Sequence, residues 1–179
     1  MKPSPALRIL TAASIGLAAL TGSLAIAAAR AEGKTHGTPE QRQTIDDLRA
    51  VGHAMFDWYV AEMKPRATGP HKSAAEIDAE TSRDLAVIPA ISTAELERVL
   101  VPKYIDAIPH ADGWGHAYEF RLNTSDPNAD YVMAVRSAGA DGRYSGEHYT
   151  IGAFDERRAG EDVVWSDGYF VRWPEASSN

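Results

Sequence analysis

The feature that most constrains the fold is a single long amphipathic helix pattern over residues 38–63. It begins at Thr38, which suits a helix cap, with Pro39 at the first helical position and Gln41 where a capping box closes. It ends before Pro65, because proline breaks a helix interior. Apolar residues recur at spacings of three and four, so one helix face must pack against another element. That face comprises Ile45, Leu48, Gly52, Met55, Tyr59 and Met63.

After this helix the pattern changes from helical to extended. A polar connection over residues 64–84 allows one helical turn at 74–79, and a capping box at Ser92 and Glu95 starts a short helix that ends near Pro102. Helices followed by antiparallel strands predict an α+β fold. Four later stretches have strand patterns, and the last two flank a Ser-Asp-Gly hairpin signal: residues 118–122, 131–136, 163–165 and 169–173.

Composition narrows the class of protein. A chain of 179 residues is the size of one domain with one core. The net charge is -7, and no run of Lys or Arg occurs after residue 40, which argues against a nucleic-acid binder. The chain contains no cysteine, which excludes disulfides, thiolate metal sites and cysteine nucleophiles.

The N-terminal residues 1–31 have the pattern of a secretory signal peptide. Lys2 and Arg8 precede an apolar run over residues 9–29, and Ala29-Arg30-Ala31 offers small residues at a cleavage site. The alternative is an uncleaved anchor, since the run is just long enough to span a bilayer. Both interpretations predict export of a single globular domain at 32–179, periplasmic or extracellular, or anchored to the inner membrane.

Residues 137–162, SAGADGRYSGEHYTIGAFDERRAGED, are rich in glycine and carboxylates, and we expect a loop here. Calcium takes six to eight oxygen ligands from carboxylates and carbonyls, and glycines let the backbone turn its carbonyls inward. The best candidate ligands are Asp141 and Asp162, followed by Asp155 and Glu147. The alternative is a solvated acidic loop in which Asp141 only forms a turn and Asp162 only caps the next strand.

Three stretches occur in a distinctive order: DLRAVGHAMFDWYV in the helix, LVPKYIDAIPHADGWGHAYEFRL over residues 100–122, and SAGADG over residues 137–142. Together they resemble the C-terminal domain of the major pseudopilin of type II secretion systems, over roughly residues 40–165. The resemblance implies a pilin-like fold, with an N-terminal helix packed on a small antiparallel sheet. It also implies a calcium site in the loop after Ser137, and a role in assembly without catalysis.

The chain departs from that family at its N-terminus. It lacks the prepilin processing motif, and Gly33, Gly37 and Pro39 interrupt the path from the apolar run to the helix. We therefore expect an exported pseudopilin-like protein outside the filament. Its role would be structural, with protein partners in the cell envelope that include secretion-apparatus components. The alternative is a free periplasmic or extracellular binding module on the same fold.

A third alternative is a hydrolase that uses histidine and aspartate. His110, His116 and His148, with Asp112, could form a zinc site or an acid–base pair. His110 and His116 are six residues apart, which is not a recognised ligand spacing, and the common nucleophile, zinc and phosphate motifs are missing. Trp114 is better explained as a packing anchor than as a binding platform. The sequence therefore favours a protein that is not an enzyme.

Overall fold

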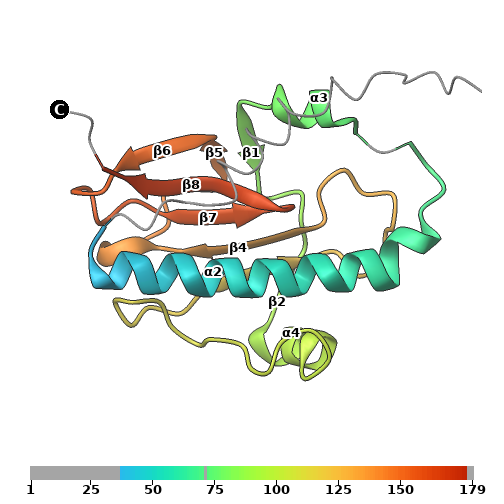
Figure 1. Cartoon of the computed structure of the whole chain (residues 1–179), viewed down its shortest axis with the longest axis horizontal. Coiled ribbons are helices and arrows are strands. Elements are labelled where there is room, and N and C mark those ends of the chain that lie inside the picture. Colours follow the sequence, from blue (N-terminus) through green and yellow to red (C-terminus); the bar gives the residue numbers. More distant parts are fainter. Residues whose placement is uncertain (1–36, 71, 177–179) are drawn as a thin grey trace, which may run out of the picture.

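The computed structural model describes residues 37–70 and 72–176. The predicted signal peptide or anchor at 1–31 lies outside these residues. Figure 1 shows one long helix lying across a sheet, with a smaller pair of strands on the opposite side of that sheet. The chain is therefore an α+β protein, as the order of its patterns predicts.

The helices begin where the sequence predicts. Helix α2, Pro39–Trp58, starts with the Thr38–Gln41 capping box and continues into a π-helical segment η1, Tyr59–Met63, and a 3-10 turn η2, Lys64–Arg66. Capping boxes also start α3, Ala74–Asp78, and α4, Thr93–Leu100. Over the described parts of the chain, none of the helices is both long enough and apolar enough to cross a membrane.

Within the described residues, eight strands form two sheets. The larger sheet has the order β2-β3-β4-β7-β8-β6, and β1 pairs separately with β5. The expectation of a purely antiparallel sheet is wrong at one edge: β7 and β8 form a hairpin, and β6 joins its outer strand in parallel. The strands are β1 Ser82–Asp84, β2 Ala90–Ile91, β3 Glu119–Leu122, β4 Met133–Ser137, β5 His148–Thr150, β6 Gly152–Asp155, β7 Val163–Ser166 and β8 Tyr169–Glu175.

The Gly-rich acidic stretch at residues 137–162 is not one continuous loop. It contains a 3-10 turn η3, Gly139–Asp141, and the strands β5 and β6. Tyr149 and Phe154 are the buried residues of these strands. Each strand pairs with an edge distant in sequence, so tertiary pairing makes strands of a segment whose polarity predicts a loop.

Successive side chains of a strand point to opposite faces of the sheet, so the large sheet has a hydrophobic core on each face. Met133 and Val135 of β4 belong to the cluster that α2 and α4 cover. Ala134 belongs to a second cluster, on the face that carries β1 and β5. Both faces of β4 are buried, which explains why all five of its residues are inaccessible to solvent.

One close contact fixes the distance between α2 and the sheet. Gly52 faces Trp165 of β7, and a β-carbon at position 52 would lie 2.5–2.6 Å from the indole ring. A glycine inside a helix costs about 1 kcal/mol relative to alanine, so its presence here needs a packing reason. The buried indole supplies that reason, since it occupies the space that a larger residue would need.

Candidate functional site

The turn at Asp112 joins the helix to the sheet. Asp112 is buried, and its Oδ1 accepts the backbone N–H groups of Trp114 at 3.0 Å and of His116 at 2.8 Å. Its Oδ2 accepts the hydroxyl of Ser137 at 2.5 Å. The next residue, Gly113, donates its N–H to Thr44 Oγ1 on α2 at 3.1 Å. The carboxylate therefore ties residues 112–116 to the end of β4, and the adjacent glycine ties them to α2.

Gly113 also touches the helix backbone directly. A β-carbon at position 113 would lie 2.3 Å from the carbonyl oxygen of Glu40, at the start of α2. Trp114 is only partly buried and belongs to neither hydrophobic cluster. The anchoring expected of Trp114 thus comes from Asp112 and Gly113, through hydrogen bonds and close backbone contact.

Asp162 and Asp141 lie in the region predicted to bind calcium. Asp162 is 2% exposed, and its Oδ2 accepts from the backbone N–H of Ser145 at 2.9 Å and from the hydroxyl of Tyr149 at 2.7 Å. Its Oδ1 is buried and has no hydrogen-bond partner among the described residues. Burial raises the pKa of Asp162, and the charge of Asp141 adds to the rise, against the two hydrogen bonds.

Asp141 is exposed and lies on η3 beside the turn that leads into β7. The N–H of Ala140 donates to the carbonyl of Ala159 at 2.8 Å, and a β-carbon added at Gly160 would lie 3.6 Å from the Asp141 carboxylate. Asp141 Oδ1 accepts from the N–H of Arg143 at 2.9 Å. The charge of Asp141 acts on Asp162, so these two carboxylates lie in the same region of the structure.

Glu147 and Asp155, the other two predicted ligands, form ion pairs elsewhere. Glu147 lies within 2.9 Å of both Arg121 and Arg136. Asp155 forms a two-point contact with Arg157 at an exposed position. Because arginines neutralise both of these carboxylates, the part of the site that could attract a cation reduces to Asp141 and Asp162.

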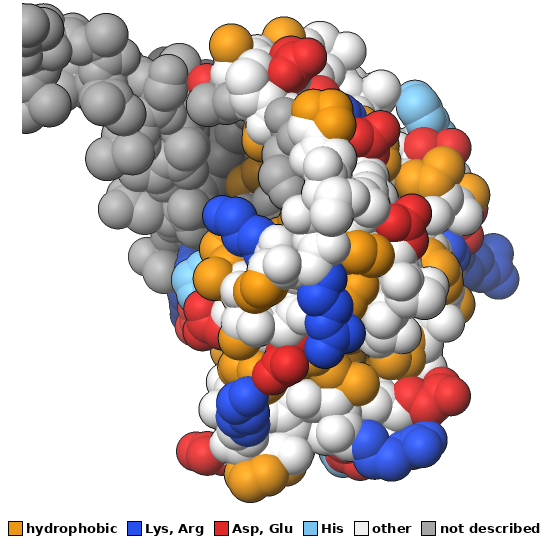
Figure 2. Space-filling view, turned by 90° about the vertical axis from the view of Figure 1, so that its right-hand side faces the viewer, with side chains coloured by type: hydrophobic (Ala, Val, Ile, Leu, Met, Phe, Trp, Pro, Cys, Tyr) orange, Lys and Arg blue, Asp and Glu red, His pale blue; other side chains and the backbone are white. Residues whose placement is uncertain are grey.

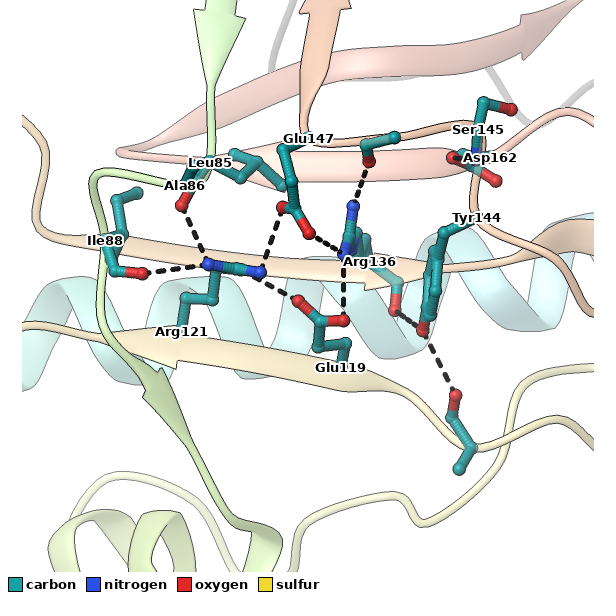
Figure 3. A network of polar contacts seen from close by, with 12 residues as sticks. Leu85, Ala86, Ile88, Glu119, Arg121, Arg136, Tyr144, Ser145, Glu147 and Asp162 are labelled. Carbon is teal, nitrogen blue, oxygen red and sulfur yellow. Dashed lines mark hydrogen bonds and ion pairs between the residues drawn. The ribbon is translucent and has the colours of Figure 1, made fainter.

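Figure 3 shows that the ion pairs of Glu147 belong to a larger network over the sheet. Arg136, 3% exposed, lies 2.8 Å from Glu119, and Arg121 also pairs with Glu119 at 2.8 Å. The Nη1 of Arg136 donates to the hydroxyl of Tyr149 at 2.7 Å, and Tyr149 in turn donates to Asp162. The buried arginine is thus linked, through one tyrosine, to the candidate cation site.

Of the residues in the hydrolase hypothesis, the structure brings together only His116 and Asp112, with His116 Nδ1 3.9 Å from Asp112 Oδ1. His110 is 77% exposed, with its Nε2 3.9 Å from Glu97, whereas Nδ1 of His116 lies 2.9 Å from the carbonyl oxygen of Gly139. His148 is an exposed residue of β5. Within residues 37–70 and 72–176, no three histidine or carboxylate side chains converge as a metal-binding cluster.

Sequence patterns miss the partners of Asp162. Its hydrogen-bond partners, Ser145 and Tyr149, lie 17 and 13 residues before it in the chain, and no local pattern marks either of them. Asp112 is easier to find, because an Asp before Gly-Trp-Gly is the pattern of a side chain that caps its own turn.

No protein-family model, no curated protein and no solved structure matches this chain.

Proposed function

We propose that this protein is an exported, pseudopilin-like structural component that acts through protein–protein contacts in the cell envelope, in connection with type II secretion. One observation carries the proposal: the three stretches that resemble the pseudopilin domain meet at one place. Ser137, which opens SAGADG, bonds Asp112 of the second stretch, and the hydroxyl of Tyr118 in that same stretch donates to Asp47, the first residue of DLRAVGHAMFDWYV on α2. The shared motifs therefore have a joint structural task, which is to fasten the helix to the sheet.

We further propose that a calcium ion stabilises the region between η3 and β7. Asp162 and Asp141 would hold it, with backbone carbonyls of the same turns completing a coordination shell that calcium tolerates in irregular form. The unpaired, buried Oδ1 of Asp162 supports this assignment, since a buried carboxylate oxygen without a partner is costly. A bound cation would offset the like charge of Asp141 and reverse the rise in the pKa of Asp162.

The calcium proposal is tested by thermal unfolding of the purified chain with calcium and with a chelator. Chelation should lower the melting temperature, and added calcium should restore it. Asp162→Asn and Asp141→Asn should lose the calcium response. Asp162 also bonds Ser145 and Tyr149, so its replacement lowers the melting temperature even without calcium. The test therefore compares the change in melting temperature on adding calcium, and not the melting temperature of the variant itself.

Asp155→Asn and Glu147→Gln are the matched controls, because both remove an acid from the same segment whose partners are arginines. These variants should keep the full response to calcium. A wild-type chain whose melting temperature ignores chelator and calcium would overturn the metal proposal. If the control variants lost the calcium response and Asp141→Asn kept it, the calcium site would have to be assigned to Asp155 or Glu147 in place of Asp141.

The structural role is tested in cells with a tagged full-length chain. We expect the tagged chain to co-purify with components of the secretion apparatus after cross-linking, and N-terminal sequencing to report whether residues 1–31 are removed. A monodisperse protein that cross-links to no envelope protein would contradict this role. Hydrolase activity lost in both His110→Ala and His116→Ala would replace it with the catalytic alternative.

A further inference from the structure

A cavity of about 240 Å³ lies beside the C-terminal end of α2, and neither Asp141 nor Asp162 lines it. It is lined by the η1 region, by Pro70 and residues 72–80, by the stretch 128–133 that leads into β4, and by the turn between β7 and β8. Figure 2 views this end, where hydrophobic side chains surround several basic ones. A cavity of about 150 Å³ is known to hold benzene, so this space accommodates one substituted ring.

The walls of the cavity are apolar where they are open. Phe56 is 42% exposed despite its size, and its ring lies 6.5 Å from that of Tyr59, centroid to centroid. Pro70 and Ile77 add aliphatic surface to the lining. These side chains could pack against both faces of a ring inserted between them, and burial of their apolar surface would favour such a ligand.

Ion pairs form the floor of the cavity, and the carboxylates in these pairs already accept hydrogen bonds from other groups of the protein. Arg83, 2% exposed, pairs with Asp167 and with Glu80. Glu80 also accepts from Lys72 at 2.8 Å and from the hydroxyl of Tyr131 at 2.9 Å. Asp167 further accepts two backbone N–H groups, at 2.8 and 3.1 Å. Both floor carboxylates therefore have their lone pairs used within the protein.

The polar groups left over in the cavity are mainly donors. In the described part of the chain, neither the hydroxyl of Tyr59 nor the ammonium of Lys64 forms a hydrogen bond or ion pair, and the buried Nε of Arg83 also has no partner. Burial, with the charge of Asp167, raises the pKa of Tyr59, which keeps its hydroxyl a donor. Asp130 is the unpaired acid of the rim, but it is exposed, where water and salt screen its charge.

We propose that this cavity binds a small aromatic carboxylate, with the ring between Phe56 and the aliphatic wall and the carboxylate at the Tyr59 hydroxyl and Lys64. The inference goes beyond the structural role and does not depend on it, since the cavity shares no residue with the candidate calcium site. A ligand this small should bind with a Kd of about 1 mM, given the free energy that each of its few atoms can contribute.

The first test compares three aromatic probes of matched size, together with acetate as a carboxylate without a ring, by NMR titration of the full chain. Benzoate should bind at the cavity, whereas benzyl alcohol should bind more weakly, and acetate and benzylamine should not bind there. Stronger binding of benzylamine than of benzoate would overturn the proposal by showing that Asp130 sets the charge preference. Equal binding of benzoate and benzyl alcohol would also overturn it, because the carboxylate would then contribute nothing.

The second test uses variants at exposed or partly exposed positions, so that folding is preserved. Lys64→Gln should weaken benzoate binding about two- to fivefold, as the loss of an exposed ion pair does. Tyr59→Phe keeps the ring and removes the donor, and should weaken binding similarly. Arg66→Gln, which removes a cation from the same turn but outside the cavity, should leave the Kd unchanged. Equal effects of Lys64→Gln and Arg66→Gln would reduce the preference to overall charge and refute the site.

Discussion

The two faces of the large sheet are both buried, yet they are held by different forces. The face under α2 and α4 is an apolar cluster of twenty buried residues, which includes Leu48, Met55 and Trp165. The opposite face, under β1 and β5, has seven buried apolar residues and two nearly inaccessible arginines, Arg83 and Arg136. Hydrophobic burial, which has no direction, dominates the first face, and directional ion pairs dominate the second.

This difference determines where function can reside. The apolar face is held mainly by hydrophobic side chains. The polar face has buried polar atoms without a partner among the described residues, including Oδ1 of Asp162 and Nε of Arg83. The candidate calcium site lies on the polar face, whereas the cavity lies where the two faces meet, with Tyr59 and Met133 from the apolar side and Arg83 from the polar side.

The largest expected effect comes from breaking the polar face at Arg83. Arg83→Met leaves the carboxylates of Asp167 and Glu80 without their arginine, and should reduce the free energy of unfolding by about 3–5 kcal/mol. Urea denaturation measures this loss. If Arg83→Met reduced the free energy of unfolding by less than the loss of a surface arginine does, buried ion pairs would not be what stabilises the polar face.

The next effect tests the apolar face at Gly52. Gly52→Ala would normally stabilise a helix by about 1 kcal/mol, but here the new methyl overlaps the indole of Trp165 and should destabilise by about 1–3 kcal/mol. Thermal or urea unfolding gives the sign of the change. Ala50→Gly, at an exposed position of the same helix, is the control, and should cost only the ordinary helix propensity of about 1 kcal/mol.

A smaller effect is the pH dependence of stability, which the carboxylate Glu119 on the polar face should influence. Burial alone would raise the pKa of Glu119, but the hydrogen bonds and charges of Arg136 and Arg121 outweigh it, so the pKa lies below the ordinary 4.5. A carboxylate with a lowered pKa in the folded state stabilises above its unfolded pKa, and that stability is lost as the pH falls.

Glu119→Gln should therefore cost about 1 kcal/mol or less at neutral pH, and should flatten the loss of stability between about pH 5 and pH 3. Urea unfolding over that range checks the slope. Glu175→Gln, at an exposed position at the end of β8, should leave the slope unchanged. An unaltered slope in Glu119→Gln would assign the acid sensitivity to other groups.

The smallest effect concerns an ion pair outside both faces. Arg157 pairs with Asp155 although its side chain is 75% exposed, so water screens the attraction. Arg157→Gln should change the free energy of unfolding by less than about 0.5 kcal/mol. A cost as large as that of Arg83→Met would show that burial is not what distinguishes the arginines.

Local signals in the sequence predicted much of the fold. The capping boxes at Thr38 and Ser92 begin helices as expected, and the Asp167-Gly168 turn, with φ of 46° and 105°, forms the hairpin. These features depend on residues within a few positions of one another. The strands β5 and β6 escaped prediction, because their partners β1 and β8 lie elsewhere in the chain.

The candidate calcium site was predicted only in part. The acidic, glycine-rich composition of residues 137–162 predicted Asp141 and Asp162 as the best ligands, followed by Asp155 and Glu147. The sequence does not show which of these four carboxylates pair with arginines. The distinction comes from arginines on other strands, which pair with Glu147, and from the burial that isolates Oδ1 of Asp162.

The sequence by itself determined the α+β class, the helix starts, the apolar face of α2 and the hairpin, since each follows from the spacing of side chains along a backbone of known period. Only the tertiary structure decided the parallel edge strand, the second core with its buried arginines, and the cavity beside Arg83. These depend on which distant segments come together, and the free energy of an ion pair or a cavity is fixed by the burial and partners that such contacts create.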